Sequence, residues 1–293
     1  MFIDPKWSEL GGILGQIDSG ITRSVWGVNA AHLIYIQQGG NWKRIGGKLM
    51  HISAGESGVW GVNKVHNIYF RRGVNVKRPR GRGWRRIPGK LKQIDSGPFG
   101  IVCGVNRRNM IYCRKNISPK RLYGRSWRRV PGRLKYISCG AYGHWGVNKN
   151  NLIYFRVGVT ASRPWGRKWK RIPGRLIQVE SGPDGLVWGV NSHGRVFTRI
   201  GITSRKPSGR SWKAVGKVKL AHVSIGRGRV YGIDRKGKPV TADLKALLGP
   251  RGSPGNPIPS VPVPVPIPSP QPGRPTPITG GGGAVRPSPG MYS

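Results

Sequence analysis

The sequence predicts an all-β fold, a six-bladed β-propeller of four-stranded blades, from two patterns that repeat in phase. A Trp recurs six times, at intervals of 35, 42, 43, 42 and 43 residues: Trp7, Trp42, Trp84, Trp127, Trp169 and Trp212. A Gly-Val-Asn triplet follows the same period at residues 27–29, 61–63, 104–106, 146–148 and 189–191, and residues 232–234 read Gly-Ile-Asp.

Each repeat consists of four short strand-like segments separated by turns, as the third copy illustrates. Residues 91–96, 101–105 and 110–114 are rich in apolar residues and are separated by Gly97 and by a polar turn. A basic loop leads to a fourth segment at residues 126–130, which a Pro-Gly pair ends. Four strands in about 42 residues match the length of a propeller blade.

The two ends of the repeat region complement each other. The last repeat supplies only three strands, near residues 220–224, 230–233 and 239–242, whereas a spare Trp-containing strand at residues 6–9 precedes the first repeat. We expect this N-terminal strand to complete the last blade and close the ring, because closure removes exposed sheet edges.

Composition divides the chain into two regions. Residues 1–248 contain the six repeats of the predicted propeller, and residues 249–293 are expected to be a disordered tail rich in Pro and Gly. Residues 258–268 of the tail carry a Pro at nearly every second position, which is typical of polyproline II. Such a segment serves either as a docking tail or as an extended spacer.

The most unusual feature of the composition is its charge. The 293 residues contain 52 Lys or Arg and only 9 Asp or Glu, for a formal net charge of +43. A like-charge excess of this size opposes folding, so we expect an anionic macromolecular partner. No apolar run has the about 18 residues that a membrane helix needs, and the N-terminus shows no secretory signal pattern.

The densest basic segments are the loops between the third and fourth strands. Arg pairs bidentately with sulfate, carboxylate and phosphate groups, so these loops are the expected binding sites, together with the Trp series beside them. The candidate ligand-binding residues are Trp42, Trp84, Trp127, Trp169, Trp212, Arg78, Arg80, Arg82, Arg121, Arg125, Arg167, Lys168 and Arg210.

A second Trp series precedes the Gly-Val-Asn triplets: Trp26, Trp60, Trp145 and Trp188. A Trp at a fixed strand position favours packing between blades over stacking on a sugar. The Asn of each triplet is expected to form a turn, because Asn tolerates the left-handed backbone region.

Acid and Ser alternate at the equivalent first-strand position: Asp18, Ser53, Asp95, Ser138, Glu180 and Ser224. Converging carboxylates can bind a cation, but the sequence offers no supporting oxygen ligands nearby, so we expect hydrogen bonding or ion pairing and no metal or cofactor. The six His are scattered, and no nucleophile or phosphate-binding loop is evident. We therefore expect no catalytic activity.

Cys103 and Cys113 flank a turn centred on residue 108, which places them opposite each other across a hairpin. Two alternatives remain open. Either they form a disulfide, which suits an oxidising compartment and leaves Cys139 free, or they are reduced thiols in the core.

One motif links the repeats: Trp-x-x-[Ile/Val]-Pro-Gly-[Lys/Arg]-Leu-x-x-[Ile/Val]-x-[Ser/Cys]-Gly, then Trp-Gly-Val-Asn, then Ile-Tyr-[Phe/Cys]-Arg. Over about residues 6–245 it resembles the tectonin β-propeller repeat of the slime-mould tectonins, a horseshoe-crab tachylectin and fish egg lectin. The resemblance implies a secreted or extracellular six-bladed lectin of innate immunity that binds N-acetylglucosamine or bacterial lipopolysaccharide.

Together these observations predict a multivalent, non-catalytic, carbohydrate-binding protein with a basic rim. Its expected partners are glycans or other anionic polymers, namely lipopolysaccharide, sulfated polysaccharide or acidic matrix protein. The alternative is a basic extracellular or biomineral matrix protein that cross-links acidic polymers, and a nucleic-acid binder ranks third because neither a groove-reading helix nor a recognised stacking module is evident.

Overall fold

The computed structural model describes residues 5–20, 24–226 and 228–244. All of these residues belong to the first of the two units into which the chain divides, Met1–Pro259 and Ser260–Ser293. The tail expected at residues 249–293 lies outside the described residues.

The regular secondary structure of the described residues is almost entirely β-strand, and a four-stranded antiparallel motif recurs in it. The first strands are β2 (Gln16–Ser19), β6 (His51–Gly55), β10 (Gln93–Ser96), β14 (Tyr136–Gly140), β18 (Gln178–Ser181) and the second half of β21 (Ser211–Gly226). The second strands are β3 (Val25–Val28), β7 (Gly58–Val62), β11 (Val102–Val105), β15 (Gly143–Val147), β19 (Val187–Val190) and β22 (Arg229–Asp234). The third strands are β4 (Leu33–Gln38), β8 (Asn67–Arg72), β12 (Met110–Lys115), β16 (Leu152–Val157), β20 (Arg195–Ile200) and β23 (Pro239–Asp243). The fourth strands are β5 (Asn41–Lys48), β9 (Gly83–Lys90), β13 (Ser126–Arg133), β17 (Lys168–Arg175), the first half of β21 and β1 (Ser8–Glu9).

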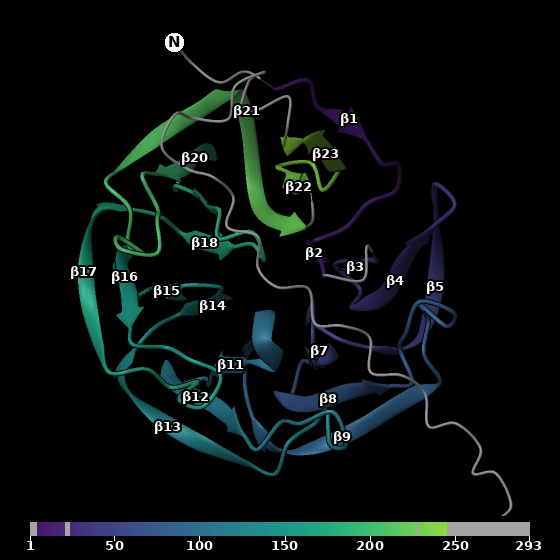
Figure 1. The fold of residues 1–293 in the computed structure, drawn as a ribbon. Coiled ribbons are helices and arrows are strands. Elements are labelled where there is room, and N and C mark those ends of the chain that lie inside the picture. The colour runs from purple at the N-terminus through teal and green to yellow at the C-terminus, as the bar shows by residue number, and fades with distance from the viewer. Residues whose placement is uncertain (1–4, 21–23, 227, 245–293) are drawn as a thin grey trace, which may run out of the picture. The chain divides into compact units, whose positions relative to one another are not determined.

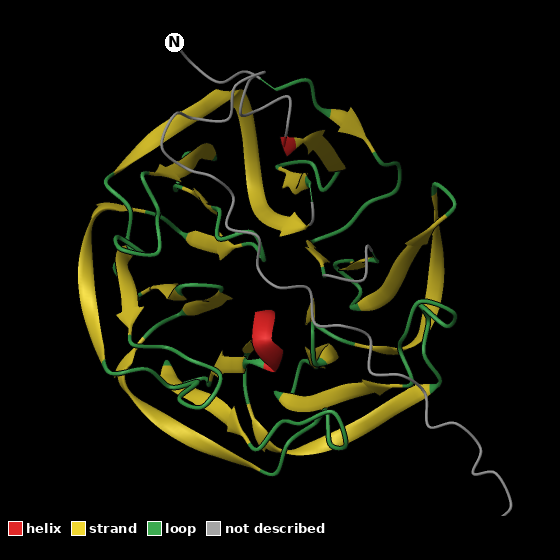
Figure 2. Ribbon diagram, viewed as in Figure 1, coloured by secondary structure: helices red, strands yellow, loops and turns green. Residues whose placement is uncertain are grey.

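The sheets stand around a common centre, with each first strand nearest the centre and each fourth strand at the periphery (Figure 1). Four sheets have four strands each, and a fifth has seven because β21 pairs with β20 through its first half and with β22 through its second. The loops between third and fourth strands lie at the periphery, and a single turn of 3-10 helix (Pro98–Gly100) lies near the centre (Figure 2).

The N-terminal strand pairs with the last strand of the chain, as the spare Trp strand of the sequence predicts. Ser8 is opposite Thr241 and Glu9 is opposite Val240 in an antiparallel pair. Near the centre, β2 also packs against β21, the strand that contains the last first-strand position. Strands from the two ends of the repeat region therefore lie side by side.

The Asn of each Gly-Val-Asn triplet forms the turn between second and third strands, as predicted. The Asn106 Oδ1 accepts hydrogen bonds from the backbone N–H of Arg108 at 3.0 Å and of Met110 at 2.9 Å. The left-handed backbone that the sequence analysis expected at the triplet Asn lies instead three residues later, at Asn109, which has a φ of 63°. The triplet Asn therefore forms the turn through its side-chain oxygen and not through its own backbone conformation. The Asn63, Asn148 and Asn191 turns repeat these bonds.

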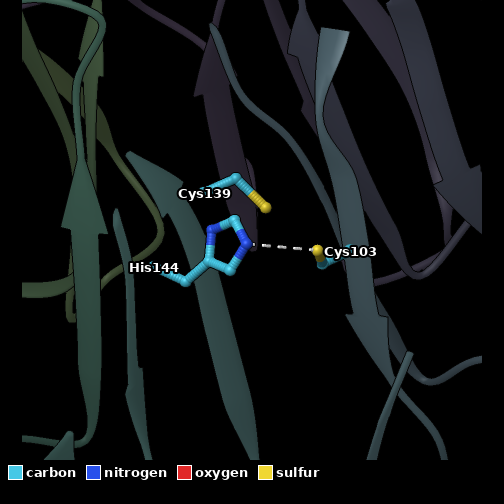
Figure 3. Close-up of side chains that lie close together, drawn as sticks. All are labelled: Cys103, Cys139 and His144. Carbon is cyan, nitrogen blue, oxygen red and sulfur yellow. Dashed lines mark hydrogen bonds between the residues drawn. The ribbon is translucent and has the colours of Figure 1, made fainter. Parts of the chain in front are cut away.

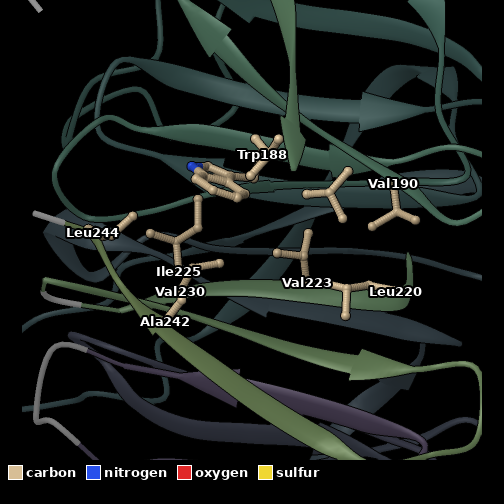
Figure 4. Close-up of a cluster of buried hydrophobic side chains, with 10 residues drawn as sticks. Trp188, Val190, Leu220, Val223, Ile225, Val230, Ala242 and Leu244 are labelled. Carbon is tan, nitrogen blue, oxygen red and sulfur yellow. The ribbon is translucent and has the colours of Figure 1, made fainter. Parts of the chain in front are cut away.

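Apolar side chains fill the spaces between neighbouring sheets. One such cluster joins Trp188 and Val190 of β19 to Val223 of β21 and Val230 of β22 (Figure 4). Trp26, Trp60, Trp145 and Trp188 are at most 2% exposed, so the Trp series before the Gly-Val-Asn triplets packs in the core, as predicted. No helix among the described residues has the length and apolarity to cross a membrane.

Candidate functional site: a basic groove and its repeated loops

Four loops between third and fourth strands share one backbone conformation. In each, two residues three positions apart exchange both backbone hydrogen bonds: Asn75 with Arg78, Ser118 with Arg121, Thr160 with Arg163, and Thr203 with Lys206. A Gly with a φ between +57° and +62° follows in each loop, at positions 81, 124, 166 and 209. Cations at equivalent loop positions are therefore held by the same backbone conformation.

A buried Arg near the end of the third strand that precedes each of these four loops holds the loop in place: Arg71, Arg114, Arg156 and Arg199. The Arg114 Nε donates to the Tyr123 carbonyl at 2.8 Å, and Arg156 donates in the same way to the Trp165 carbonyl at 2.9 Å. Burial lowers the pKa of Arg114 to about 10, so the side chain stays charged at neutral pH. These arginines anchor the loops rather than extend into solvent.

A groove lies between β9 and the loop at residues 116–125 of the next sheet. Its lining includes five Arg and one Tyr: Arg85, Arg86, Arg114, Arg121, Arg125 and Tyr123. The Arg85 guanidinium stacks on the Tyr123 ring with its Cζ 4.1 Å from the ring centroid, which orients it without neutralising its charge. No acidic residue is among the described residues that line the groove, so it is suited to an anionic ligand.

Part of this arrangement recurs in the next pair of sheets. Arg128 of β13 stacks on Trp165 of the following loop with its Cζ 4.3 Å from the ring centroid. Trp165 occupies the loop position of Tyr123, whereas the other two loops have Arg80 and Ser208 there. The aromatic support is therefore limited to two of the four loops, while an Arg just before the fourth strand occurs in all of them, as Arg82, Arg125, Arg167 and Arg210.

The predicted cations are exposed, but the structure brings only Arg121 and Arg125 into the groove. Arg78, Arg82, Arg167, Lys168 and Arg210 lie exposed on the other loops or at the start of a fourth strand. The Arg80 Nε donates to the Gln38 Oε1 of the preceding sheet at 2.6 Å. The predicted ligand-binding residues do not include Arg85, Arg86 and Tyr123. The sequence signal for the first two is the pair of cations that follows Trp42, Trp84, Trp127 and Trp169.

The Trp42 series is half-buried and joins neighbouring sheets. The Trp127 Nε1 donates to the Pro88 carbonyl at 2.9 Å, and Arg114 lies over its ring with Cζ 5.0 Å from the centroid. A Cβ on Gly89, which has a φ of +113°, would lie 3.1 Å from the same ring. Trp84, Trp169 and Trp212 repeat these contacts, and Trp42 donates to the Gly11 carbonyl at 2.9 Å. The four rings that have an Arg over one face, those of Trp84, Trp127, Trp169 and Trp212, thus have a structural role that leaves little free face for a sugar.

The alternating acids and serines form hydrogen bonds between first strands. The Asp95 carboxylate accepts from the Ser53 hydroxyl at 3.1 Å and from the Cys139 backbone N–H at 2.6 Å. Glu180 accepts from the Ser138 hydroxyl at 3.2 Å. Burial, followed by the charge of Asp18, raises the pKa of Asp95 to about 7, and burial also raises the pKa of Asp18 and Glu180. These three acids therefore form hydrogen bonds near the centre and do not neutralise the cations at the periphery.

Cys103 and Cys113 are joined by a disulfide between β11 and β12, and Cys139 is free and buried. Of the two alternatives that the sequence leaves open, the structure contains the oxidised one.

The fold and the site define a β-propeller with a cation-lined groove. The tectonin domain family model matches residues 13–235, so the chain belongs to the tectonin family. No curated protein sequence matches it.

Solved structures with this fold are distant in sequence. A gluconolactonase, XC5397 from Xanthomonas campestris, aligns with a TM-score of 0.57 at 7% identity, covering 82% of this chain and 89% of that one. The Cps50 (Swd1) β-propeller domain of Myceliophteria thermophila aligns with a TM-score of 0.53 at 5% identity, covering 82% and 100%. At these identities the likeness shows the fold alone.

Proposed function

We propose that the chain is a closed, six-bladed tectonin propeller that binds anionic glycans at several sites, without catalysis and outside the cell. The observation that carries this proposal is the groove between β9 and the 116–125 loop, in which five arginines converge without an acid among the described lining residues. Closure is supported by the pairing of β1 with β23 and by the packing of β2 on β21.

The groove chemistry favours sulfated or phosphorylated sugars over neutral ones. Guanidinium groups pair bidentately with sulfate and phosphate, whereas recognition of a neutral sugar depends more on exposed aromatic faces. Arg85 covers one such face on Tyr123, and Arg114 lies over Trp127. Lipopolysaccharide phosphates and sulfated polysaccharides are therefore better candidates than free N-acetylglucosamine.

Repetition adds affinity for a polymer. Four loops on the same frame place cations at successive positions around the periphery, so a long polyanion that binds one loop meets the next at a high effective concentration. Weak contacts at each loop can therefore add up to strong binding of a chain and weak binding of a monosaccharide.

The test is a titration with a heparin-like sulfated oligosaccharide at low and high salt, in parallel with an N-acetylglucosamine oligomer. Removing Arg85 and Arg121 together should weaken sulfated-ligand binding about 100-fold, because each charge-assisted hydrogen bond contributes about 1.5 kcal/mol. The matched control removes Arg107 and Arg108 together from the exposed turn at residues 106–109, so that both variants lose two charges. That turn joins second to third strands, so it lies at the opposite end of the antiparallel strands from the groove loops.

Equal losses in the Arg85/Arg121 and Arg107/Arg108 double variants would contradict a groove and leave only a diffuse charge effect. Binding that vanishes uniformly with salt and shows no preference among polyanions would instead support a matrix protein that cross-links acidic polymers.

A further inference from the structure

Because the repeats are alike, each residue can be compared with those at the equivalent positions of the other repeats. Three residues that differ from their equivalents lie close together in the structure. His144 is the second residue of β15, at a position where the other second strands have Val: Val25, Val59, Val102, Val187 and Val230. Cys103 occupies a position that is Trp in four repeats and Tyr in one. Cys139 occupies a position held by Ser in three repeats: Ser19, Ser96 and Ser181.

These three side chains converge between two neighbouring sheets. Cys139 and His144 are direct cross-strand partners on β14 and β15, and Cys103 projects toward them from β11 (Figure 3). Their ligand atoms all lie within 4.8 Å of one another, and each residue is at most 1% exposed. The His144 Nε2 lies 3.6 Å from the Cys103 Sγ and 2.5 Å from the Pro164 carbonyl oxygen, and its Nδ1 has no hydrogen-bond partner in the structure.

Two sulfurs and an imidazole are donors that suit Zn²⁺. Zn–S bonds of about 2.3 Å and Zn–N bonds of about 2.1 Å give a sulfur–nitrogen separation of about 3.6 Å across a tetrahedral site. The Cys103–His144 separation already has this value. The obstacle is chemical: the Cys103 sulfur is bonded to Cys113 and is not a thiolate.

We propose that opening the Cys103–Cys113 disulfide creates a buried zinc site formed by Cys103, Cys139 and His144. Reduction takes two electrons and two protons from a dithiol, which becomes a disulfide, and yields two thiols on the chain. Zn²⁺ then displaces the Cys103 and Cys139 thiol protons to solvent and binds neutral His144. Ligation through Nε2 moves the imidazole proton to Nδ1, and a water molecule or the released Cys113 thiol completes the coordination. In the reduced protein the bound metal thus replaces the disulfide as the cross-link between strands in this region.

The decisive variant is Cys113→Ser, which frees Cys103 without breaking up the three-residue cluster. In a non-thiol phosphine reductant, this full-length variant should bind one Zn²⁺ per chain by elemental analysis and show thiolate-to-metal absorption with Co²⁺. The wild-type chain should bind the metal only after reduction of the disulfide. In that reaction the phosphine and one water molecule give phosphine oxide, and the two protons of the water convert the two sulfurs to thiols.

Two matched controls come from the repeats themselves. Adding His144→Val or Cys139→Ser to Cys113→Ser introduces residues that the fold accepts at equivalent positions. Each should weaken zinc binding at least 100-fold, beyond the 10–100-fold effect of losing a mere outer-shell partner. Circular dichroism verifies that the variants are folded.

No stoichiometric metal in folded Cys113→Ser would overturn the proposal, as would equal binding in the two control variants. These results do not depend on whether the basic groove binds glycans, because metal content and groove binding are measured separately.

Discussion

The hydroxyl of Ser224 donates a hydrogen bond to the Oδ1 of Asp18 at 2.7 Å, across 206 positions of sequence. The same hydroxyl accepts from the Ser19 backbone N–H at 3.1 Å. Ser53 and Ser138 make the equivalent pair of bonds to the sheets that follow them. The contact between β21 and β2, the last and the first of the first strands, thus has the same pair of hydrogen bonds as the contacts from Ser53 and Ser138.

Ser224→Ala should therefore destabilise the chain as much as Ser138→Ala does. Each substitution removes a donor to a buried carboxylate and an acceptor for a buried N–H, at a cost of about 1–3 kcal/mol in the free energy of unfolding. Urea unfolding of both variants measures this cost. If Ser138→Ala is costly and Ser224→Ala is neutral, the ring is not closed in solution.

Asp95→Asn should remove a contribution to stability that decreases as pH rises. The pKa of Asp95 is raised from 3.8 to about 7, so the folded state binds more protons than the unfolded state between about pH 4 and 7. The stabilising contribution of this group is fully present below about pH 4 and is lost as pH rises through about 7. Its slope is at most about 1.4 kcal/mol per pH unit.

The measurement is the difference in free energy of unfolding between wild type and Asp95→Asn at several pH values. Burial lowers the pKa of His51 to about 3 and of His222 to about 4, which acts in the opposite sense, but both proteins carry these groups. Wild type should lose stability relative to the variant from about pH 4 to 7. A flat difference curve would show that Asp95 titrates normally.

Trp127→Phe distinguishes a structural Trp from a sugar platform. It removes the bond from Nε1 to the Pro88 carbonyl and should cost about 1 kcal/mol of stability, with less than a twofold change in affinity for a sulfated oligosaccharide. Thermal unfolding and the same binding titration are the two readouts. A large loss of binding at unchanged stability would instead assign the Trp42 series to the ligand site.

Gly55→Ala tests how closely the inner strands approach one another. A methyl group on Gly55 would overlap the Ser96 carbonyl of the next sheet, so we expect a loss of about 1–3 kcal/mol or failure to fold. Gly46 has nothing within 4 Å of an added Cβ, so Gly46→Ala should change stability by less than about 0.5 kcal/mol. Comparable effects in the two variants would argue against this packing.

The repeat pattern alone determined the strands, the Asn turns, the buried Trp26 series and the partner of the N-terminal strand. These features are local, or recur with a fixed period, because side-chain alternation and turn chemistry act between residues close in sequence. The Trp-x-x-Ile-Pro-Gly motif also identified the family. The motif did not reveal that Trp127 lies between Arg114 and the segment around Gly89, because Gly89 belongs to the neighbouring sheet.

Only the tertiary structure decided which charges and sulfurs meet. Arg85 and Tyr123 are 38 positions apart and become neighbours because adjacent sheets place a fourth strand beside the following loop. Cys103, Cys139 and His144 likewise come from three strands of two sheets. Contacts of this kind depend on how far each sheet is rotated and how closely it packs on the next, which no single repeat encodes.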